Sequence, residues 1–560
     1  MSAAGGPAVV VRGLECTYPD TAAPALEAID LTLPGGAVAV VMGASGAGKS
    51  TLARCLTRIV PTFVPADVRG DILLAGASIA GRRVGELAGT IAMVFQDFEA
   101  QLFSTDVTQE VIFALEQTGV PPAEMAARMR AALGAVGLVG FEGRDPTTLS
   151  GGEKQRLAIA GVLALHPPIM VMDEPTTDLD PEGRHALYDV IARLRAEGLA
   201  LLVVEHDVEA ARDADELILL RDGRVAARGR PAAILADVHL CARSGVRPPD
   251  VCRVFAALGL PDPPAEVEEA AARMRAAGLL PAPPPARPDP PRSGTPLVEV
   301  RGLGHSYAHG RQALGDVTLA IGAGEFVAII GRNGSGKTTL VKHLIGLLEP
   351  TTGEVRLGGR PVAELPLEDL AQRVGYVFQD PDHQLFAATV ADEVAFGPRN
   401  FGLEGPALAE RVDATLDAVG LAAERDEDPF LLRKGERQRL AVATVLAMRP
   451  RVLILDEPTT GLDYPQQRRM LELLAELRAG GTTIVVITHS PWVVVEYAER
   501  ALLMRGGTLV FDGALAALLA DEALLRSAAF EAPPAARVAR ALGIPARTVD
   551  ELARALGAGA

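Results

Sequence analysis

Cysteine is scarce in this chain of 560 residues. The sequence holds four, Cys16, Cys55, Cys241 and Cys252, and no two of them form a C-x-x-C pair. So few thiols in so long a chain do not make a disulfide framework. We therefore expect reduced thiols that fill small spaces in the core or on the surface of a cytoplasmic protein.

Long apolar runs and positive charge are lacking as well. No stretch reaches the ~20 apolar residues that span a bilayer, and the N-terminal residues carry no basic segment followed by an apolar run, so we expect no secretory signal. Lys and Arg number 54 against 71 Asp and Glu, a formal net charge of −17. Because affinity for nucleic acid comes from Lys and Arg neutralising phosphates, this balance argues against a nucleic-acid partner. With 49% hydrophobic and 22% charged residues, a globular chain of several domains remains.

The sequence contains one unit twice. GASGAGKST (43–51) recurs as GRNGSGKTT (331–339), and VMDEPTTDLD (171–180) recurs as ILDEPTTGLD (454–463). VFQDFEAQLF pairs with VFQDPDHQLF, and GEKQRLAIA pairs with GERQRLAVA. The paired lysines are 288 positions apart, and the paired glutamines, Asp-Glu aspartates and histidines are each 283 apart. Such constant spacing indicates duplication.

A proline-dense segment, PAPPPARPDPPRSGTP, separates the two copies. It favours an extended spacer with a reach of roughly 50 Å. Each copy is followed by a short helical stretch, because RPPDVCRVFAALGLP in the first resembles APPAARVARALGIP in the second. The predicted parts are a first domain 1–230, a helical extension 231–280, the linker 281–296, a second domain 297–515 and a second helical extension 516–560.

Within each copy the pattern is α/β. Short Val/Ile/Leu runs end at a glycine or a carboxylate and alternate with helical segments, as in GAVAVVMG followed by KSTLARCLTRIV. Continuous apolar runs of this kind indicate a parallel sheet covered on both faces. In such sheets ligands bind at the carboxyl ends of the strands.

Two segments fit the phosphate-binding loop G-x-x-x-x-G-K-[ST]. Its glycines let backbone N–H groups turn toward phosphate, and the following helix directs its N-terminal donors at the same anion. Lys49 and Lys337 should reach the β- and γ-phosphates of ATP, and Ser50 and Thr338 should bind Mg²⁺. The candidate residues are Gly43, Ser45, Gly46, Gly48, Lys49, Ser50 and Thr51 in the first copy and Gly331, Asn333, Gly334, Gly336, Lys337, Thr338 and Thr339 in the second.

Further polar residues follow the apolar runs in matched register. Carboxylates at strand ends can hold Mg²⁺ through water, and a second carboxylate beside them can orient or deprotonate the attacking water. This assigns the metal to Asp173 and Asp456 and catalysis to Glu174 and Glu457. A histidine contacting the γ-phosphate, a glutamine sensing Mg²⁺ and water, and a tyrosine stacking on adenine complete each set. The candidates are His206 and His489, Gln96 and Gln379, and Tyr18 and Tyr307.

The segment LSGGEKQR (149–156) indicates a family. Locally Ser150 and Glu153 form a helix capping box, but together with the phosphate loops and Asp-Glu strands the segment resembles the nucleotide-binding domain of ATP-binding cassette (ABC) proteins. The resemblance implies two P-loop domains, each with a helical subdomain. They would sandwich two ATP molecules head to tail within one chain, each site taking its loop from one copy and its signature from the other. The signature residues are Ser150, Gly151, Gly152 and Glu153 in the first copy and Arg433, Lys434, Gly435 and Glu436 in the second. The second signature departs from the pattern, since two cations replace its serine and first glycine.

The Gln-Leu-Phe segments after Gln96 and Gln379 resemble those of ATPases from energy-coupling factor (ECF) importers of vitamins, vitamin precursors and transition-metal ions. The resemblance implies a groove that receives a coupling helix from a transmembrane energy-coupling subunit, beside a separate substrate-binding membrane subunit. We expect a Mg²⁺-dependent ATPase coupled to transport, a translocase peripheral to the cytoplasmic face of the membrane. Leu385 and Phe386 should be exposed in this groove. The first copy lacks the Gly-Pro-x-Asn ending of the second.

Two other interpretations stay open. One is the ATPase of another importer, for example a sugar transporter with a fused cassette pair. The other is a ribosome-associated tandem cassette protein without a membrane partner, which would need a strongly basic helical arm. Residues 261–296 hold five acids and four bases, which disfavours such an arm.

Overall fold

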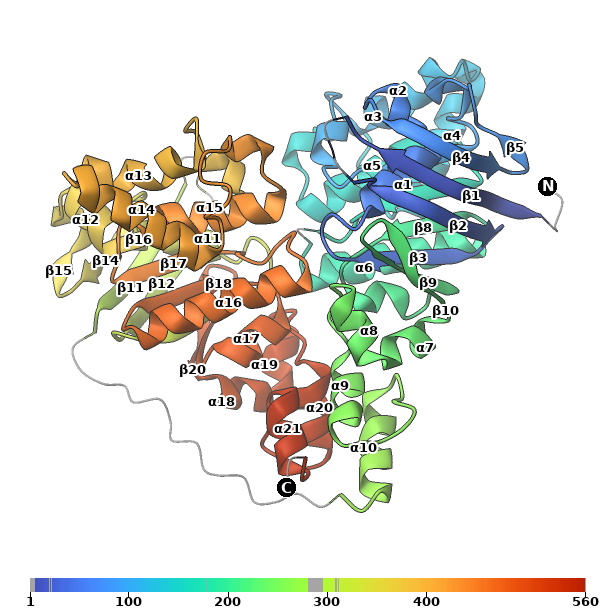
Figure 1. The fold of residues 1–560 in the computed structure, drawn as a ribbon. Helices are drawn as coiled ribbons and strands as arrows, with labels where there is room; N and C mark the ends of the chain where they lie inside the picture. The colour runs from blue at the N-terminus through green and yellow to red at the C-terminus, as the bar shows by residue number, and fades with distance from the viewer. Residues whose placement is uncertain are drawn as a thin grey trace. The chain divides into compact units, whose positions relative to one another are not determined.

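The computed structural model describes residues 6–19, 21, 23–177, 179–279, 296–307, 310 and 312–558. They form two compact units, unit 1 (Met1–Cys252) and unit 2 (Arg253–Ala560), shown in Figure 1. The boundary falls inside helix α9 (Asp250–Ala257), within the predicted first extension. The predicted linker 281–296 lies outside the described residues except for Pro296. Among the described helices, none is long and apolar enough to cross a membrane.

The centre of unit 1 is a largely parallel sheet of strand order β10-β9-β3-β8-β7-β6. Only β10 runs antiparallel to its neighbour. Its strands are β3 (Val38–Gly43), β6 (Ile91–Val94), β7 (Ile169–Asp173), β8 (Ala200–Val204), β9 (Glu216–Arg221) and β10 (Arg224–Gly229). The apolar runs predicted as buried strands are β3, β7 and β8, so the predicted α/β fold is confirmed.

Both faces of this sheet are buried, by different layers. Val38, Val40 and Met42 of β3 pack with the helices α3 to α6, whereas Ala39 and Val41 face α1 and a second, antiparallel sheet β2-β1-β4-β5. The sequence analysis anticipated a covered sheet but not this antiparallel layer. Its strands are β1 (Pro7–Thr17), β2 (Leu26–Pro34), β4 (Asp67–Leu74) and β5 (Ala77–Ser78).

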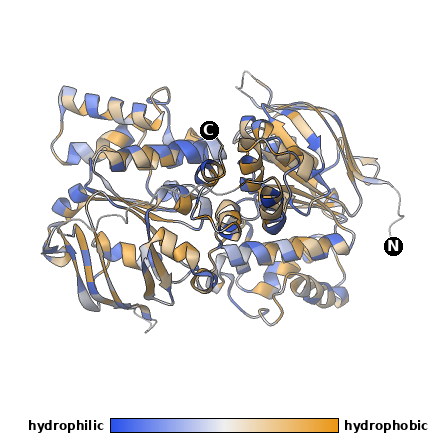
Figure 2. Cartoon of the chain, turned by 90° about the horizontal axis from the view of Figure 1, so that it is seen from below, coloured by the Kyte–Doolittle hydropathy of each residue, from blue (hydrophilic) through white to orange (hydrophobic). Residues whose placement is uncertain are grey.

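Hydrophobic and hydrophilic residues are mixed along the ribbons of the chain, as Figure 2 shows in orange and blue. The helices of unit 1 carry buried apolar residues among exposed polar ones. They are α1 (Lys49–Leu56), α2 (Ile59–Thr62), α3 (Val107–Gln117), α4 (Pro122–Ala135), α5 (Gly151–Leu163), α6 (Pro181–Ala196), α7 (Pro231–Ala236) and α8 (Val238–Arg243). Helices α3, α4 and α5 contact one another and form the predicted helical subdomain. The four cysteines are buried, and none of them forms a disulfide.

Unit 2 repeats this plan, with sheets of order β16-β17-β18-β13-β19-β20 and β12-β11-β14-β15. Its strands are β11 (Val298–Ser306), β12 (Gln312–Ile321), β13 (Phe326–Ile330), β14 (Thr352–Leu357), β15 (Arg360–Pro361), β16 (Val374–Val377), β17 (Val452–Asp456), β18 (Thr483–Ile487), β19 (Arg500–Arg505) and β20 (Thr508–Ala514). Its helices are α11 (Lys337–Leu344), α12 (Leu367–Arg373), α13 (Val390–Asn400), α14 (Gly405–Val419), α15 (Lys434–Leu446), α16 (Tyr464–Ala479) and α17 (Pro491–Tyr497).

The two similar proline-led segments of the extensions are helices α9 and α20 (Pro534–Ala541). Helix α10 (Val267–Ala276), which precedes the proline-dense segment, packs against α20, and both belong to unit 2. Arg537 Nη2 of α20 lies 3.9 Å from Glu268 Oε1, and Glu268 belongs to α10. The second extension also contains α18 (Leu515–Ala520), α19 (Glu522–Ser527) and α21 (Val549–Ala555).

Candidate functional site

Each phosphate loop joins the end of a buried parallel strand to a helix. In unit 1 the loop runs from Gly43, the last residue of β3, to Lys49, the first of α1. Gly48 has φ 98°, and a Cβ there would lie 2.5 Å from the carbonyl oxygen of Ala25, so only glycine fits. Gly336 has the same φ in unit 2. The strand, glycine turn and helix therefore follow one another as the motif requires.

The loop lysines are buried and hold their own loops. Lys49 Nζ donates to the carbonyl oxygens of Gly43 and Ala44, each at 2.9 Å. Lys337 Nζ donates to Gly331 at 2.7 Å and Arg332 at 2.9 Å. A buried ammonium with three donors needs such acceptors. These carbonyls mark the place where phosphate oxygens would become the competing acceptors.

A hydroxyl and a carboxylate meet beside each lysine. Ser50 Oγ donates to Asp173 Oδ1 at 3.0 Å, and Thr338 Oγ1 donates to Asp456 Oδ2 at 3.2 Å. Burial, together with the charge of Glu174, raises the pKa of Asp173 to about 6. Hydroxyl and carboxylate oxygens are the ligands that Mg²⁺ prefers, and a cation here would offset the burial of the acid. The residues present thus fit a magnesium ion.

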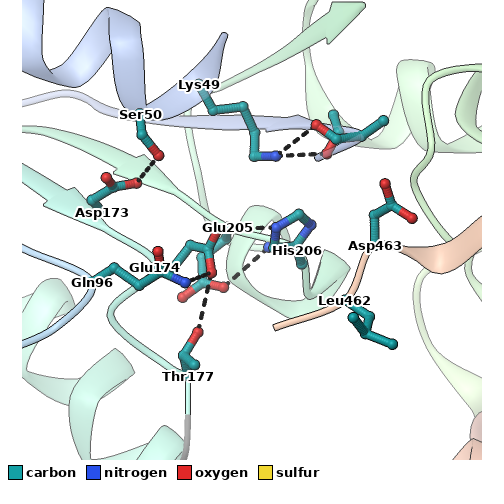
Figure 3. A network of polar contacts seen from close by, with 12 residues as sticks. Lys49, Ser50, Gln96, Asp173, Glu174, Thr177, Glu205, His206, Leu462 and Asp463 are labelled. Atoms are coloured by element: carbon teal, nitrogen blue, oxygen red, sulfur yellow. Dashed lines mark hydrogen bonds and ion pairs between the residues drawn. The ribbon is translucent and has the colours of Figure 1, made fainter. Parts of the chain in front are cut away.

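Several polar side chains of the first site form hydrogen bonds with Glu174, as Figure 3 shows. Gln96 Nε2 donates to Glu174 Oε2 at 2.7 Å, Thr177 Oγ1 donates to the same oxygen at 3.4 Å, and His206 Nε2 lies 3.0 Å from Glu174 Oε1. These side chains come from the ends of β6, β7 and β8 and the loop after β7. The structure therefore brings Gln96, Glu174 and His206 together at the carboxyl edge of the sheet, where the sequence predicted them.

The second site differs in detail. His489 Nε2 lies 2.9 Å from Asn333 Oδ1 and 3.6 Å from Glu457 Oε1. Burial, reinforced by the charge of Asp456, raises the pKa of Glu457 to about 8. Tyr376 of β16 donates from its hydroxyl to Asp456 Oδ2 at 3.1 Å. The histidine of this copy is thus shared between the phosphate loop and the catalytic candidate.

The candidate adenine-stacking tyrosines lie against the phosphate-loop helices. Tyr18 Oη is 3.1 Å from Thr51 Oγ1, and Tyr307 Oη is 3.2 Å from Thr339 Oγ1. Tyr307 is 42% exposed, so its ring is accessible to a base. Both copies hold the tyrosine in the same way.

Comparison with known proteins identifies the family. A family model described as "ABC transporter" matches residues 26–177 and 314–460, which together make up more than half of the chain. The chain belongs to the ABC transporter family. A putative ABC transporter ATP-binding protein of Caldanaerobacter subterraneus subsp. tengcongensis is 41% identical over 545 residues, which cover 94% of this chain and 95% of that protein. One of Methanosarcina acetivorans is 37% identical over 564 residues, covering 96% and 91%.

Two further matches concern parts of this ABC protein. The solved structure of cbiO1 from Clostridium perfringens, described as part of the ABC transporter complex cbiONQ, is 35% identical and covers 41% of this chain and 93% of its own, with a TM-score of 0.39. A model described as "AAA domain, putative AbiEii toxin, Type IV TA system" matches residues 428–495. As an ABC transporter ATP-binding subunit, the chain binds ATP and is an ATPase.

The two ABC signatures begin α5 and α15 and differ at their first turns. Ser150 Oγ accepts the N–H of Glu153 at 3.4 Å, while Glu153 Oε2 accepts the N–H of Ser150 at 2.7 Å, so the predicted capping box is confirmed. In the second signature, Glu436 Oε2 accepts the N–H of Arg433 at 2.9 Å. The side chain of Lys434 lies against Gly461 of unit 2, since a Cβ on Gly461 would lie 3.2 Å from Lys434 Nζ. Glycine at 461 thus leaves room for the extra lysine.

Sequence reasoning missed three polar residues of the ABC sites. Thr177 donates to Glu174, Tyr376 donates to Asp456, and Glu205 accepts the backbone N–H of His206. Tyr376 and Glu205 could have been noticed by comparing the two copies, because a different residue stands at the matching position of the other copy. These residues are Met93 for Tyr376 and Thr488 for Glu205. Such differences inside a repeated site mark where the two sites are built unequally.

Proposed function

We propose that this ABC ATPase is the energy-coupling subunit of an ECF-type importer for a vitamin, a vitamin precursor or a transition-metal ion. It would work at the cytoplasmic face of the membrane with a transmembrane coupling subunit and a substrate-binding membrane subunit. Each copy binds one ATP with Mg²⁺, and each site joins the phosphate loop of one copy to the signature of the other.

The chemistry of the proposal follows from the site. Mg²⁺ would supply charge neutralisation of the phosphates, with Ser50 and Asp173 holding it in the first copy. Lys49 turns from its loop carbonyls to the phosphate oxygens. Glu174 would orient or deprotonate the attacking water. Gln96 and His206, which are hydrogen-bonded to Glu174 in this structure, would contact Mg²⁺ and the γ-phosphate when ATP binds. Residues of unit 2 at matched positions have the same roles.

The observation that carries the importer assignment is an exposed aromatic pair after each glutamine. Phe103 and Phe113 meet edge to face with ring centroids 4.6 Å apart, and Phe386 and Phe396 do so at 4.7 Å. The four phenylalanines are 62%, 40%, 58% and 46% exposed, in that order. An amphipathic helix from a membrane subunit would bury such rings, as helices in grooves do.

A glutamate binds the backbone of the first phenylalanine of each pair, which favours a preformed docking surface. Glu110 of α3 accepts the backbone N–H groups of Phe103 and Ser104, at 3.0 and 2.8 Å. Glu393 of α13 does the same for Phe386 and Ala387, at 2.8 and 2.6 Å. The same carboxylate clamp recurs in both copies although their helices end differently.

The expectation that Leu385 is exposed is wrong. Leu385 is 4% exposed and belongs to the core of unit 2, whereas its neighbour Phe386 points outward. A test of docking must therefore leave Leu385 intact.

The proposal is tested with a variant in which both aromatic pairs are replaced by serine, at Phe103, Phe113, Phe386 and Phe396. Tagged protein is purified from detergent-solubilised membranes of cells that express it, and co-purified proteins are identified by mass spectrometry. Wild type should retain two kinds of integral membrane protein, and the variant should lose them while keeping basal ATPase. Leu367→Ser, at a residue that is 69% exposed on α12, is the matched control and should keep both.

Other outcomes contradict the proposal. Recovery with permease domains and a soluble binding protein would indicate another importer, and recovery with ribosomes would indicate a non-transport ABC protein. Retention of the membrane proteins by the variant that lacks both aromatic pairs would place the docking surface elsewhere.

A further inference from the structure

One buried carboxylate in unit 1 joins two segments of the ATP site. Glu205 follows β8 and is 2% exposed. Its Oε1 accepts a hydrogen bond from the backbone N–H of Thr176 at 2.9 Å, and its Oε2 accepts one from the backbone N–H of His206 at 3.1 Å. Figure 3 shows Glu205 beside His206 and Glu174. Since Thr176 lies two residues after Glu174, one side chain links the loop behind the catalytic glutamate to the histidine that contacts it.

Glu205 lies in a cluster of charged groups. Helix α6 contributes Arg184 and Tyr188, and Arg184 Nη1 lies 3.0 Å from Asp207 Oδ2. The hydroxyl of Tyr188 is buried and has no hydrogen-bond partner in the part of the chain that the structure describes. Burial raises the pKa of Glu205 to about 8, and the negative charges of Glu174 and Asp207 act in the same direction. The titratable and charged groups around Glu205 are Glu174, Arg184, Tyr188, His206, Asp207 and Glu209.

The second copy builds the same place from neutral side chains. At the offset of 283, the positions of Arg184, Tyr188, Glu205 and Asp207 are occupied by Gln467, Leu471, Thr488 and Ser490. There Gln467 Nε2 donates to the carbonyl oxygens of Thr459 at 3.2 Å and Leu462 at 3.1 Å. In unit 2 the loop after Glu457 is thus fastened to α16 through Gln467, and Thr488 binds Glu457 itself. In unit 1 Glu205 fastens the corresponding loop to the histidine segment.

We propose that Glu205 is a positioning residue of the first ATP site, which fastens the loop behind Glu174 to His206 and makes this fastening depend on a proton. The ionised carboxylate accepts both N–H groups through charge-assisted hydrogen bonds. Protonation converts one oxygen to an O–H donor and weakens one of the two links. The loop and His206 then move more independently, so hydrolysis at the first site slows as the pH falls below about 8. The second copy has Thr488 at this position, so its hydrolysis can depend on pH through Glu457 but not through this link. The inference concerns ATP hydrolysis and does not depend on the kind of transporter.

The test isolates the first site in a Glu457→Gln background. Single-turnover hydrolysis, with protein in excess over radiolabelled ATP and Mg²⁺, resolves even a slow site between pH 6.5 and 9. With Glu205 present, the rate constant should rise with a midpoint near pH 8. Glu205→Gln keeps the shape but cannot ionise, so its rate should stay near the low-pH value. We expect the two to differ about fivefold at pH 9 and little at pH 6.5, since one charge-assisted link is roughly twice as strong as a neutral one.

Two further measurements separate positioning from a structural role. In the Glu174→Gln background, where the second site hydrolyses, Glu205→Gln should not change the pH profile. Amide hydrogen exchange of peptides containing Thr176 and His206, taken as the ratio of Glu205→Gln to wild type, should rise about fivefold between pH 6.5 and 9. This ratio removes the intrinsic pH dependence of exchange and needs no turnover. The proposal is overturned if the single-turnover rate constant of Glu205→Gln in the Glu457→Gln background still rises with a midpoint near pH 8. It is also overturned if the exchange ratio does not change with pH.

Discussion

Replacing Glu205 by Gln should change how the stability of unit 1 depends on pH. The folded state raises the pKa of Glu205 from 4.5 to about 8, so between these values it keeps a proton that the unfolded chain has released. The contribution of the Glu205 carboxyl to the free energy of unfolding is therefore fully present below pH 4.5 and is lost as the pH rises through about 8. At about 1.4 kcal/mol per pH unit, the loss between pH 6 and pH 8 is about 2 kcal/mol, after allowing for partial ionisation at the upper end.

Glu205→Gln removes this loss, so the unfolding free energy of the variant minus that of wild type should rise by about 2 kcal/mol from pH 6 to pH 8. The assay is urea unfolding of the nucleotide-free chain, followed by far-UV circular dichroism. Trp492, the single tryptophan, lies in unit 2, so its fluorescence identifies which transition belongs to that unit. Glu197→Gln, at the exposed end of α6, controls for the loss of one negative charge. A difference that stays constant with pH would refute the reasoning, because Glu205 would then be ionised in the folded state.

With the membrane partner present, Glu457→Gln should abolish nearly all steady-state hydrolysis, and Glu174→Gln should leave a measurable fraction. The reason is that the loop of Glu174 is proposed to face the signature with Arg433. A larger loss from Glu174→Gln would contradict this. Tyr376→Phe removes a hydroxyl that orients Asp456, so half-maximal hydrolysis should need about tenfold more Mg²⁺, and an unchanged Mg²⁺ titration would show that the hydroxyl has no such role. Gly48→Ala should lower the saturating stoichiometry in ATP titrations of a hydrolysis-deficient chain from two to one, since its Cβ would lie 2.5 Å from a carbonyl oxygen; two bound ATP would show that the loop can shift.

The phosphate loops and Asp-Glu strands could be predicted from the sequence because their residues are contiguous. A buried strand, a glycine turn and a helix start need no knowledge of distant segments, and the duplication repeats each signal. Glu205 could not be assigned in this way. It binds a backbone N–H that lies 29 residues earlier, and the residue before His206 looks like an ordinary polar end of a strand.

Leu385 and Phe386 show a second limit. The two neighbours are equally apolar, yet one is 4% and the other 58% exposed. They lie in a loop without the period of a helix or strand, so no pattern tells which one points inward. Their orientation is set by Gln384, whose Nε2 donates to Ala441 and Thr444, and by the clamp of Glu393 on the backbone of Phe386. Hydrophobicity alone therefore predicted an exposed apolar residue in this segment but not which of the two it is.

The place of α10 in unit 2 changes what the proline-dense segment does. The segment leaves α10 and returns at β11, and both ends belong to unit 2. The segment therefore closes a loop within one folded body, and the covalent passage between the units lies in α9. Doubling its length should cost only about 0.6 kcal/mol of closure entropy. A protease cut there would nick unit 2 without separating the halves of the chain. A gene divided at this point would place α10 on one polypeptide and α20, against which it packs, on the other.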